Sequence, residues 1–232
     1  MSEEKGIGAV IVAGGTGSRM GGEEEKLFID LGGIPILALT LRSFQKCPEI
    51  ERIVLAVSSR VAAGLEEKIF SIVGRRKISA VVPGGPRRQD SVLNGLGAFA
   101  PPPASVLVHD GDRPFVSPEL IGTVSRRARK EPVILALRAR DTIKLSDGRR
   151  IERTLDRDRI WQAQTPQGFP FGPFYRAHLR ARAEGWEVTD DASIMEKAGF
   201  EVGIVEGTPE NIKITAPCDR EIARAIFRTM PS

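Results

Sequence analysis

Short, continuous apolar runs alternate along the chain with longer segments that mix apolar and polar residues. Each run is bounded by polar or glycine-rich residues, which is typical of strands buried on both faces of a parallel sheet. The runs predict strands at 7–12, 52–57, 79–82, 105–109, 133–139 and 201–205. The intervening segments predict helices at 35–46, 61–73, 89–100, 118–130, 171–184, 190–198 and 217–230. This alternation predicts a mostly parallel, twisted sheet with helices on both faces, a three-layer α/β/α fold.

Residues 139–158 interrupt this alternation. Two segments of alternating polarity, 140–145 and 150–155, flank Asp147-Gly148, which is a strong signal for a hairpin turn. Both segments carry charge on one face, so they cannot be central strands, and we predict a projecting β-hairpin arm on an otherwise single domain spanning 1–232. A second copy of the chain is the natural surface for its apolar side chains, although the hairpin could instead fold back on its own domain. Those side chains are Ile143, Leu145, Ile151 and Leu155.

Composition narrows the class of protein. With 41% hydrophobic and 28% charged residues, the 232-residue chain is typical of a soluble globular protein, and no apolar run is long enough to cross a membrane. The first residues lack the apolar stretch of a signal peptide, and two distant cysteines, Cys47 and Cys218, fit a reducing cytoplasm. Two histidines and two cysteines argue against a protein-built metal site. A net charge of +4 suits a small anionic substrate, and 6% aromatic residues argue against nucleic acid.

A glycine-rich loop with two cations carries the strongest chemical signal. Gly14-Gly15-Thr16-Gly17-Ser18-Arg19 follows the first predicted strand, and Lys26 comes shortly after. Glycines let backbone N–H groups turn toward a phosphate, and the cations add fixed positive charge, so the loop predicts a polyphosphate site. The third glycine of a dinucleotide fingerprint is missing, and Lys26 is followed by Leu27 instead of the Ser or Thr of a P-loop. A glycine-rich surface turn with incidental charges is the alternative.

Three polar, glycine-containing loops follow predicted strands: 13–20, 83–91 and 110–114. In open α/β sheets ligands bind at the carboxyl ends of the strands, so we expect these loops to form one site.

Three candidates in or near these loops have a structural and a functional interpretation. His109 ends a buried strand and is either a hydrogen-bonded structural histidine or a general base. Asp190, in the pair Asp190-Asp191, is either a helix N-cap or a metal ligand. Lys213 lies in an alternating stretch and could be an edge-strand lysine.

The motifs together resemble the sugar-phosphate nucleotidyltransferases, and among them the 2-C-methyl-D-erythritol 4-phosphate cytidylyltransferases of the non-mevalonate isoprenoid pathway. The resemblance spans Ala9 to Ala223, and its most specific motifs follow the glycine loop. They are His109-Asp110-Gly111-Asp112-Arg113-Pro114, Thr165-Pro166-Gln167-Gly168-Phe169, Thr189-Asp190-Asp191-Ala192-Ser193 and Asn211-Ile212-Lys213. The resemblance implies a Rossmann-like nucleotidyltransferase fold and a homodimer assembled through the 139–158 arm.

The implied reaction transfers CMP from CTP to a polyol phosphate, methylerythritol 4-phosphate, and releases pyrophosphate. Mg²⁺, held mainly by the CTP phosphates, would shield the charge. The resemblance implies catalytic roles for Arg19, Lys26 and Lys213. It implies nucleotide contacts from Ala13, Gly14, Gly15, Thr16, Gly17, Ser18, Gly84, Gly85, Arg88, Ser91, Asp110 and Gly111. It implies acceptor contacts from Asp110, Arg113, Thr142, Arg157, Thr165 and Thr189, with Thr142 and Arg157 reaching the neighbouring subunit.

The chain departs from the family pattern in two places. Glu25-Lys26-Leu27 stands where the family usually has Pro-Lys-Gln, and Asp112 stands where the family has a small residue. Asp112 could change the preferred acceptor or pair with Arg113. Two other functions stay open: a ribitol 5-phosphate cytidylyltransferase with overlapping motifs, and a CTP-binding domain without catalysis.

Overall fold

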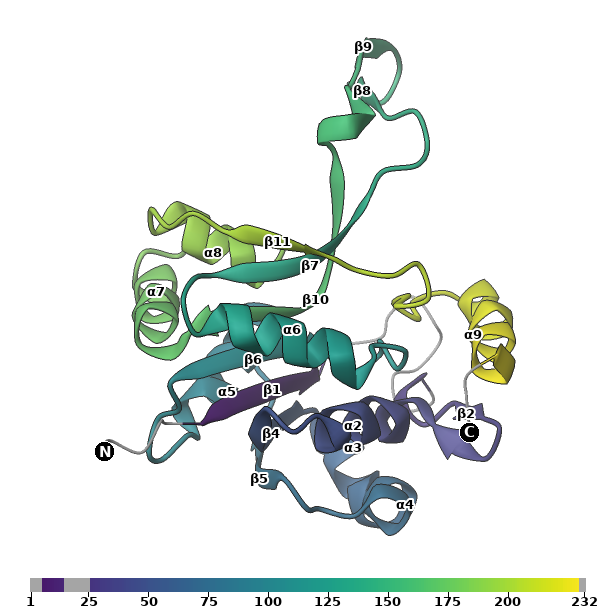
Figure 1. Cartoon of the computed structure of the whole chain (residues 1–232), viewed down its shortest axis with the longest axis vertical. Helices are drawn as coiled ribbons and strands as arrows, with labels where there is room; N and C mark the ends of the chain where they lie inside the picture. The colour runs from purple at the N-terminus through teal and green to yellow at the C-terminus, as the bar shows by residue number, and fades with distance from the viewer. Residues whose placement is uncertain (1–5, 15–25, 230–232) are drawn as a thin grey trace.

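A seven-stranded sheet forms the centre of the protein (Figure 1). The computed structural model describes residues 6–14 and 26–229. The strand order across the sheet is β11-β7-β10-β6-β1-β4-β5, and every strand is parallel to the others except β10, which runs antiparallel to β6 and β7. The strands are β1 (Ile7–Ala13), β4 (Ile50–Val57), β5 (Ile78–Pro83), β6 (Ser105–Asp110), β7 (Val133–Arg138), β10 (Trp161–Pro170) and β11 (Gly203–Glu206).

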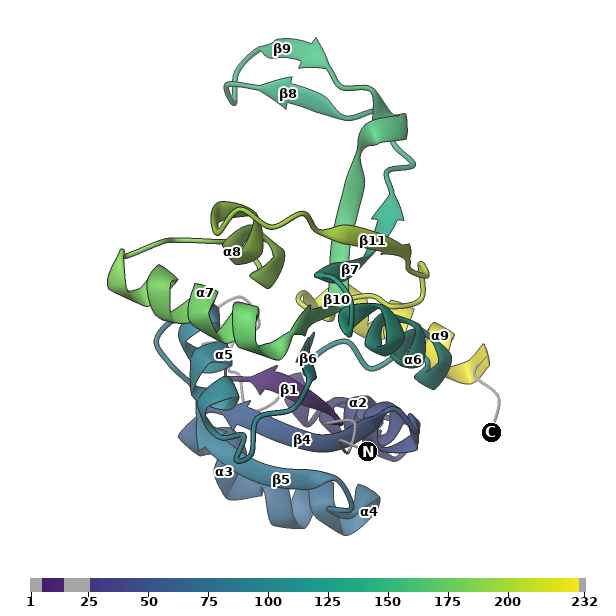
Figure 2. The ribbon, with the colours of Figure 1, turned by 60° about the vertical axis from the view of Figure 1, so that its left-hand side comes forward.

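Helices cover both faces of this sheet, which confirms the predicted three-layer fold (Figures 1 and 2). Side chains alternate along β1 between the two faces: Ile11 packs in the core under α2 and α6, whereas Val10 packs under α5 and α7. No helix in the described ranges combines the length and the apolarity needed to cross a bilayer. The helices are α2 (Ile36–Lys46), α3 (Ser59–Gly64), α4 (Ser71–Val73), α5 (Arg88–Gly97), α6 (Pro118–Ala128), α7 (Phe171–Ala183), α8 (Asp191–Lys197) and α9 (Pro217–Thr229).

The predicted helix at 61–73 consists of three consecutive segments. It starts earlier than predicted, because the Ser58 side chain caps α3 by accepting the Val61 N–H, and a π-helical segment, Leu65–Phe70, separates α3 from α4. Within this π-helical segment, Leu65, Ile69 and Phe70 stay buried in the core under the sheet.

Strand β10 was not predicted from the sequence. Pro166 and Gly168 argue against a central strand, because proline cannot donate to the ladder and glycine adds no packing surface. The pairing with β7 shifts register between Gln164 and Gln167, so the ladder passes over Pro166. At Gly168 a β-carbon would come within 2.8 Å of the Ala128 β-carbon, so the glycine lets α6 approach the sheet.

A small apolar cluster lies beyond the main core. The hairpin β2 (Asp30–Leu31) and β3 (Ile34–Pro35) turns through Gly32 and Gly33, both at positive φ, and α9 packs against it. Ile214, which is fully buried, and Ile212 join this cluster. The chain on both sides of Lys213 is therefore anchored in apolar packing.

The predicted hairpin arm projects from the body of the protein (Figures 1 and 2). Its strands, β8 (Lys144–Ser146) and β9 (Ile151–Thr154), form a separate two-stranded sheet and are shorter than expected. Leu145 is 39% exposed and Ile151 is 63% exposed, so the body of the chain leaves these two apolar side chains largely uncovered.

A buried hydrogen-bonded chain joins β10 to the end of β6. His109 Nε2 donates to the carbonyl of Arg113 at 3.0 Å, so its Nδ1 is free to accept the Thr165 hydroxyl, also at 3.0 Å. The Thr165 oxygen in turn accepts the Asp110 N–H. Burial is the main cause that lowers the pKa of His109 from 6.5 to about 4. His109 is thus a neutral structural histidine, as one of the two interpretations predicted.

This burial makes the stability of the protein depend on pH. His109 binds a proton near pH 6.5 when unfolded but only near pH 4 when folded, so unfolding takes up a proton between these values. We expect the free energy of unfolding to fall by up to about 3 kcal/mol from this group as the pH drops from 6.5 to 4. Urea titrations of the wild type and of His109→Gln at several pH values measure the difference. Equal pH slopes in both proteins would contradict the assignment.

Candidate active site

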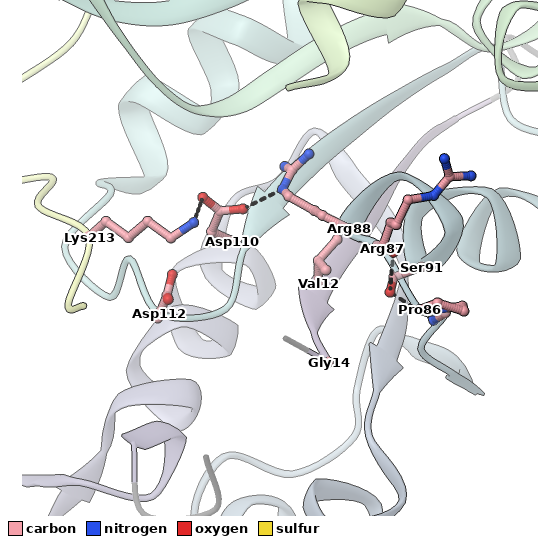
Figure 3. A pocket seen from close by; sticks show the side chains of 10 residues that line it. Val12, Gly14, Pro86, Arg87, Arg88, Ser91, Asp110, Asp112 and Lys213 are labelled. Carbon is pink, nitrogen blue, oxygen red and sulfur yellow. Dashed lines mark hydrogen bonds and ion pairs between the residues drawn. The ribbon is translucent and has the colours of Figure 1, made fainter. Parts of the chain in front are cut away.

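The described residues at the carboxyl ends of β1, β5 and β6 lie together, as the sequence predicted. Gly14 and Gly84 lie in contact, since a β-carbon on Gly14 would come 3.4 Å from the Gly84 α-carbon. Between the loops lies a hollow of about 210 Å³, here called the nucleotide hollow (Figure 3). Its lining consists of Val12, Gly14, Gly85, Pro86, Arg87, Arg88, Ser91, Asp110, Asp112 and Lys213. The predicted residues Gly15, Thr16, Gly17, Ser18 and Arg19 lie outside the described residues.

The loop after β5 has a fixed shape. The Gly85 N–H donates to the Ser91 hydroxyl at 2.9 Å, and a β-carbon on Gly85 would come within 2.4 Å of the Asp90 β-carbon. The Arg87 guanidinium binds both oxygens of Asp90 at 2.9 Å, and the Asp90 carboxylate also accepts the Arg87 backbone N–H at the start of α5. The N-terminus of α5 therefore lies at the hollow, where its dipole favours an anion.

Hydrogen bonds to β1 and α2 hold the loop after β6 in place. The Gly111 N–H donates to the Val12 carbonyl at 2.8 Å, and the Thr40 hydroxyl donates to the Gly111 carbonyl at 2.9 Å. A β-carbon on Gly111 would come 3.1 Å from that of Ala13. Ala13 and Gly111, both predicted nucleotide contacts, thus hold the β1 and β6 loops together and do not line the hollow.

Asp110 is the centre of the charge arrangement. Arg88 Nε lies 2.9 Å from Asp110 Oδ1, and Lys213 Nζ lies 3.0 Å from Asp110 Oδ2 (Figure 3). Arg113 Nε is 3.5 Å from Oδ2. Burial by itself would raise the pKa of Asp110, but the charges of Arg88, Lys213 and Arg113 hold the pKa of this carboxyl well below its usual range. We call these four residues the Asp110 cluster.

Arg88 also pairs with a second buried carboxylate. Its Nη1 lies 2.6 Å from Asp191 Oδ2, and His178 Nε2 lies 3.5 Å from the other oxygen of Asp191. Although burial opposes the charged form, Asp191 and Asp110 raise the pKa of Arg88. Arg88 Nη2 is buried without a hydrogen-bond partner among the described residues, so the guanidinium keeps a free donor.

A second hollow, of about 250 Å³, adjoins the first at the Asp110 cluster. We call it the acceptor hollow. All four residues of the cluster line it, as do the predicted residues Thr165 and Thr189. The remaining lining residues are Ala163, Gln164, Gln167 and Asp190. Arg88, Asp110 and Lys213 belong to both hollows, so an anion in either hollow would lie next to the same cations.

Asp190 is the N-cap of α8. Its carboxylate accepts the Ser193 N–H at 3.0 Å and the Gln167 amide at 2.8 Å, which confirms the cap interpretation. Within the described ranges no group of three His, Cys, Asp or Glu side chains could hold a metal ion.

Lys213 is positioned by a buried amide network. The Asn211 side-chain amide donates to the Thr165 carbonyl at 2.9 Å, and the Asn211 backbone carbonyl accepts from Arg113 Nη1 at 2.9 Å. The Ile214 N–H donates to the Asp112 carbonyl at 3.0 Å. Residues 211–215 form no strand, so the interpretation of Lys213 as an edge-strand lysine is wrong. The sequence singled out Asp191 as part of a motif but not as a partner of Arg88, and it gave no signal for the roles of Gln164 and His178 in supporting this site.

Lys26 lies close to Asp112. Its Nζ is 2.5 Å from Asp112 Oδ2, and the two side chains are 15% and 13% exposed. Asp112 therefore pairs with Lys26. Of the two possibilities left open for Asp112, the pairing with Arg113 is wrong, because Arg113 is taken up by Asp110 and Asn211.

Thr142 and Arg157 lie apart from both hollows of their own chain. Both are exposed on the arm, where Arg157 Nη1 donates to the Arg140 carbonyl at 3.2 Å. Within one chain the described structure thus brings together all the predicted acceptor residues except these two.

Comparison with known proteins identifies the family. Residues 7–229 match the family model described as 2-C-methyl-D-erythritol 4-phosphate cytidylyltransferase. A relative of that name from Pelotomaculum thermopropionicum is 40% identical over 225 residues, which cover 96% of this chain and 94% of the relative. The crystal structure of 4-diphosphocytidyl-2C-methyl-D-erythritol synthase from Anaerococcus prevotii matches with a TM-score of 0.85 and 33% identity, covering 97% of both chains. A cytidylyltransferase structure from Thermus thermophilus matches with a TM-score of 0.78 and 31% identity, covering 97% of this chain and all of the other. The chain belongs to the 2-C-methyl-D-erythritol 4-phosphate cytidylyltransferase family.

Proposed function

We propose that this protein transfers CMP from CTP to 2-C-methyl-D-erythritol 4-phosphate. A phosphate oxygen of the acceptor attacks the α-phosphorus of CTP, a new phosphoanhydride bond forms, and the bond between the α- and β-phosphates breaks. The products are 4-diphosphocytidyl-2-C-methyl-D-erythritol and pyrophosphate. The observation that carries the proposal is the position of the Asp110 cluster, whose residues Arg88 and Lys213 line both hollows.

This reaction needs cations and positioning more than it needs a base. The attacking phosphate is already anionic at neutral pH, so no side chain has to remove a proton. The obstacle is the repulsion between two anions and the charge that develops at the α-phosphorus. Lys213 and Arg88 line both hollows, which suits their positive charges to that role. His109 is neutral and fully hydrogen-bonded, so it is not the general base.

We assign Arg19, Lys26 and Lys213 to catalysis. The glycine loop from Gly14 to Ser18 would hold the triphosphate, and Gly85 and Ser91 would contact the cytosine at the opposite wall. Asp110, Arg113, Thr165 and Thr189 would contact the acceptor. The Thr165 hydroxyl already donates its hydrogen to His109 and accepts the Asp110 N–H. It can therefore only accept a hydrogen bond from the polyol phosphate, through its remaining lone pair.

Mg²⁺ fits this site as a companion of the nucleotide. The described residues supply no set of three ligands, and the Asp110 carboxylate is fully engaged by cations. The ion would therefore be held mainly by triphosphate oxygens, where it would neutralise negative charge.

We further propose that the protein is a cytoplasmic homodimer joined through the 139–158 arm. The arm projects from the body of the protein (Figure 2). It exposes Leu145 and Ile151, and its residues Thr142 and Arg157 do not line the hollows of their own chain. A partner subunit that covers these apolar side chains would receive the two polar ones in its acceptor hollow.

The reaction is tested by pyrophosphate release with CTP and Mg²⁺, comparing methylerythritol 4-phosphate with ribitol 5-phosphate and CTP with ATP. We expect release with CTP and methylerythritol 4-phosphate. Release with ribitol 5-phosphate alone would move the protein to activation of another polyol. CTP binding without release would leave a non-catalytic binding domain.

Substitution of Lys213 tests the shared cation. We expect Lys213→Gln to lower kcat by about 100-fold or more, because a donor to the developing charge is lost. The melting temperature should change little, since the Lys213 side chain is 37% exposed and Asp110 keeps Arg88 and Arg113. Lys197→Gln on α8, whose ammonium lies at the Glu187 carbonyl, is the matched control. Wild-type kcat in Lys213→Gln would contradict the assignment.

Substitution of Arg157 tests the arm. We expect Arg157→Ala to raise the acceptor KM by about tenfold while the CTP KM stays unchanged, because a charged hydrogen bond to the acceptor phosphate is lost. Arg149→Ala, at the turn of the same arm, is the control. Co-expression of Arg157→Ala with Lys213→Gln should restore sites with the wild-type acceptor KM and kcat, since a mixed dimer contains one intact site. A lack of restoration would show that Arg157 does not act across subunits.

A further inference from the structure

The feature that the proposed reaction does not use is the carboxylate of Asp112. It lies in the loop between β6 and α6 and lines the nucleotide hollow below the Asp110–Lys213 pair (Figure 3). Its Oδ2 holds the Lys26 ammonium at 2.5 Å. The Asp112 backbone is tied to Ile214, whose N–H it accepts and whose side chain is fully buried. The carboxylate is thus fixed in place, whereas the lysine reaches it through a long side chain.

Only one of the two oxygens of the Asp112 carboxylate has a hydrogen-bond partner among the described residues. Its Oδ1 is buried without a hydrogen-bond partner in the part of the chain that the structure describes. The negative charge of Asp110 lies close by, and the cations that face Asp112 are Lys26 and Lys213. Lys213 is shared with Asp110, so Lys26 is the cation that Asp112 holds directly. Removal of Lys26 would leave a buried carboxylate with a like-charged neighbour, which is costly.

A triphosphate in the nucleotide hollow would compete for the same ammonium. A lysine ammonium is a compact charge with three donors, and an anion that draws it away must break the contact with Asp112. The Asp112 carboxylate also repels phosphate oxygens directly, because it lines the same hollow. Both effects lower the net gain from nucleotide binding.

We propose that Asp112 is a positioning residue that sets the nucleotide affinity: it holds Lys26 in the empty site and gives it up to the triphosphate. This inference rests on the proposed function, since it takes the nucleotide hollow as the place where CTP binds. Glu25-Lys26-Leu27 and Asp112 are the two departures from the family pattern, and the structure joins them in one ion pair.

A proton accompanies the exchange. Burial, followed by the charge of Asp110, raises the pKa of Asp112, and Lys213 and Lys26 oppose this rise. When Lys26 moves to the triphosphate, Asp112 loses its direct counter-charge and gains an anionic neighbour. Its carboxyl group then takes up a proton from the solvent, so nucleotide binding is linked to proton uptake.

The first test is calorimetric titration of the enzyme with CTP and Mg²⁺ in the absence of acceptor. We expect Asp112→Asn, which keeps the shape and removes the charge, to bind CTP about tenfold more tightly than the wild type. Asp112→Ala should shift the affinity in the same direction. Glu196→Gln, an exposed residue on α8, makes the same change in net charge and should leave the affinity unchanged. Equal or weaker binding in folded Asp112→Asn would overturn the proposal.

A double-mutant cycle separates release of Lys26 from simple repulsion. In a Lys26→Met background there is no ammonium to release, so the further change Asp112→Asn should bring a much smaller gain in CTP affinity. A gain as large as in the wild-type background would overturn the proposal, because the carboxylate would then act on the phosphates alone.

Proton uptake gives a readout that a merely structural role would not move. Titrations near pH 6 in buffers of different ionisation enthalpy measure the protons taken up with CTP, and we expect more in the wild type than in Asp112→Asn. Equal uptake would contradict the exchange.

The outcomes for Asp112 and for the proposed function can be told apart. If the wild type binds CTP and releases pyrophosphate but does not differ from the Asp112 variants in CTP affinity or proton uptake, the role of Asp112 is overturned and the proposed function stays intact. A wild type that binds no CTP would overturn both.

Discussion

The pairing of one buried carboxylate, Asp110, with three cations is the interaction on which the site depends. Arg88 comes from α5, Arg113 from the loop after β6, and Lys213 from the segment before α9. A buried ion pair contributes little net stability, because desolvation offsets much of the attraction. The effect of the cluster is on position: Asp110 fixes cations from three parts of the chain where they line the acceptor hollow, and two of them, Arg88 and Lys213, also line the nucleotide hollow.

Strand β10 connects this cluster to the fold. Because β10 runs antiparallel between β6 and β7, its Thr165 meets the end of β6 and takes up both His109 and the Asp110 N–H. The same strand supplies Gln164, whose amide is bonded to Asn211 and so to the segment of Lys213. The antiparallel strand β10 thus connects the end of β6 to the segment that carries Lys213.

The sequence predicted the regular part of this molecule and missed the irregular part. Continuous apolar runs identified the parallel strands, and Asp147-Gly148 identified the arm, because these signals are local. Strand β10 was missed because Pro166 and Gly168 are poor strand residues that only the packing of β7 and α6 makes acceptable. The convergence of the loops followed from the parallel sheet, but the partner of Asp112 did not: Lys26 lies 86 residues away in sequence, and spacing carries no information on such a contact.

The anchoring of Lys213 has a consequence for how the protein is made. Ile212 and Ile214 are held in the apolar cluster formed by the β2–β3 hairpin and α9, and α9 is built from the last described residues of the chain. The apolar packing on both sides of Lys213 is therefore complete only once α9 has docked. During synthesis the sheet can form on the ribosome, but this packing is completed only after residues 217–229 have emerged. A chain that ended before α9 would lack part of the packing that holds the segment of Lys213 against the body of the protein.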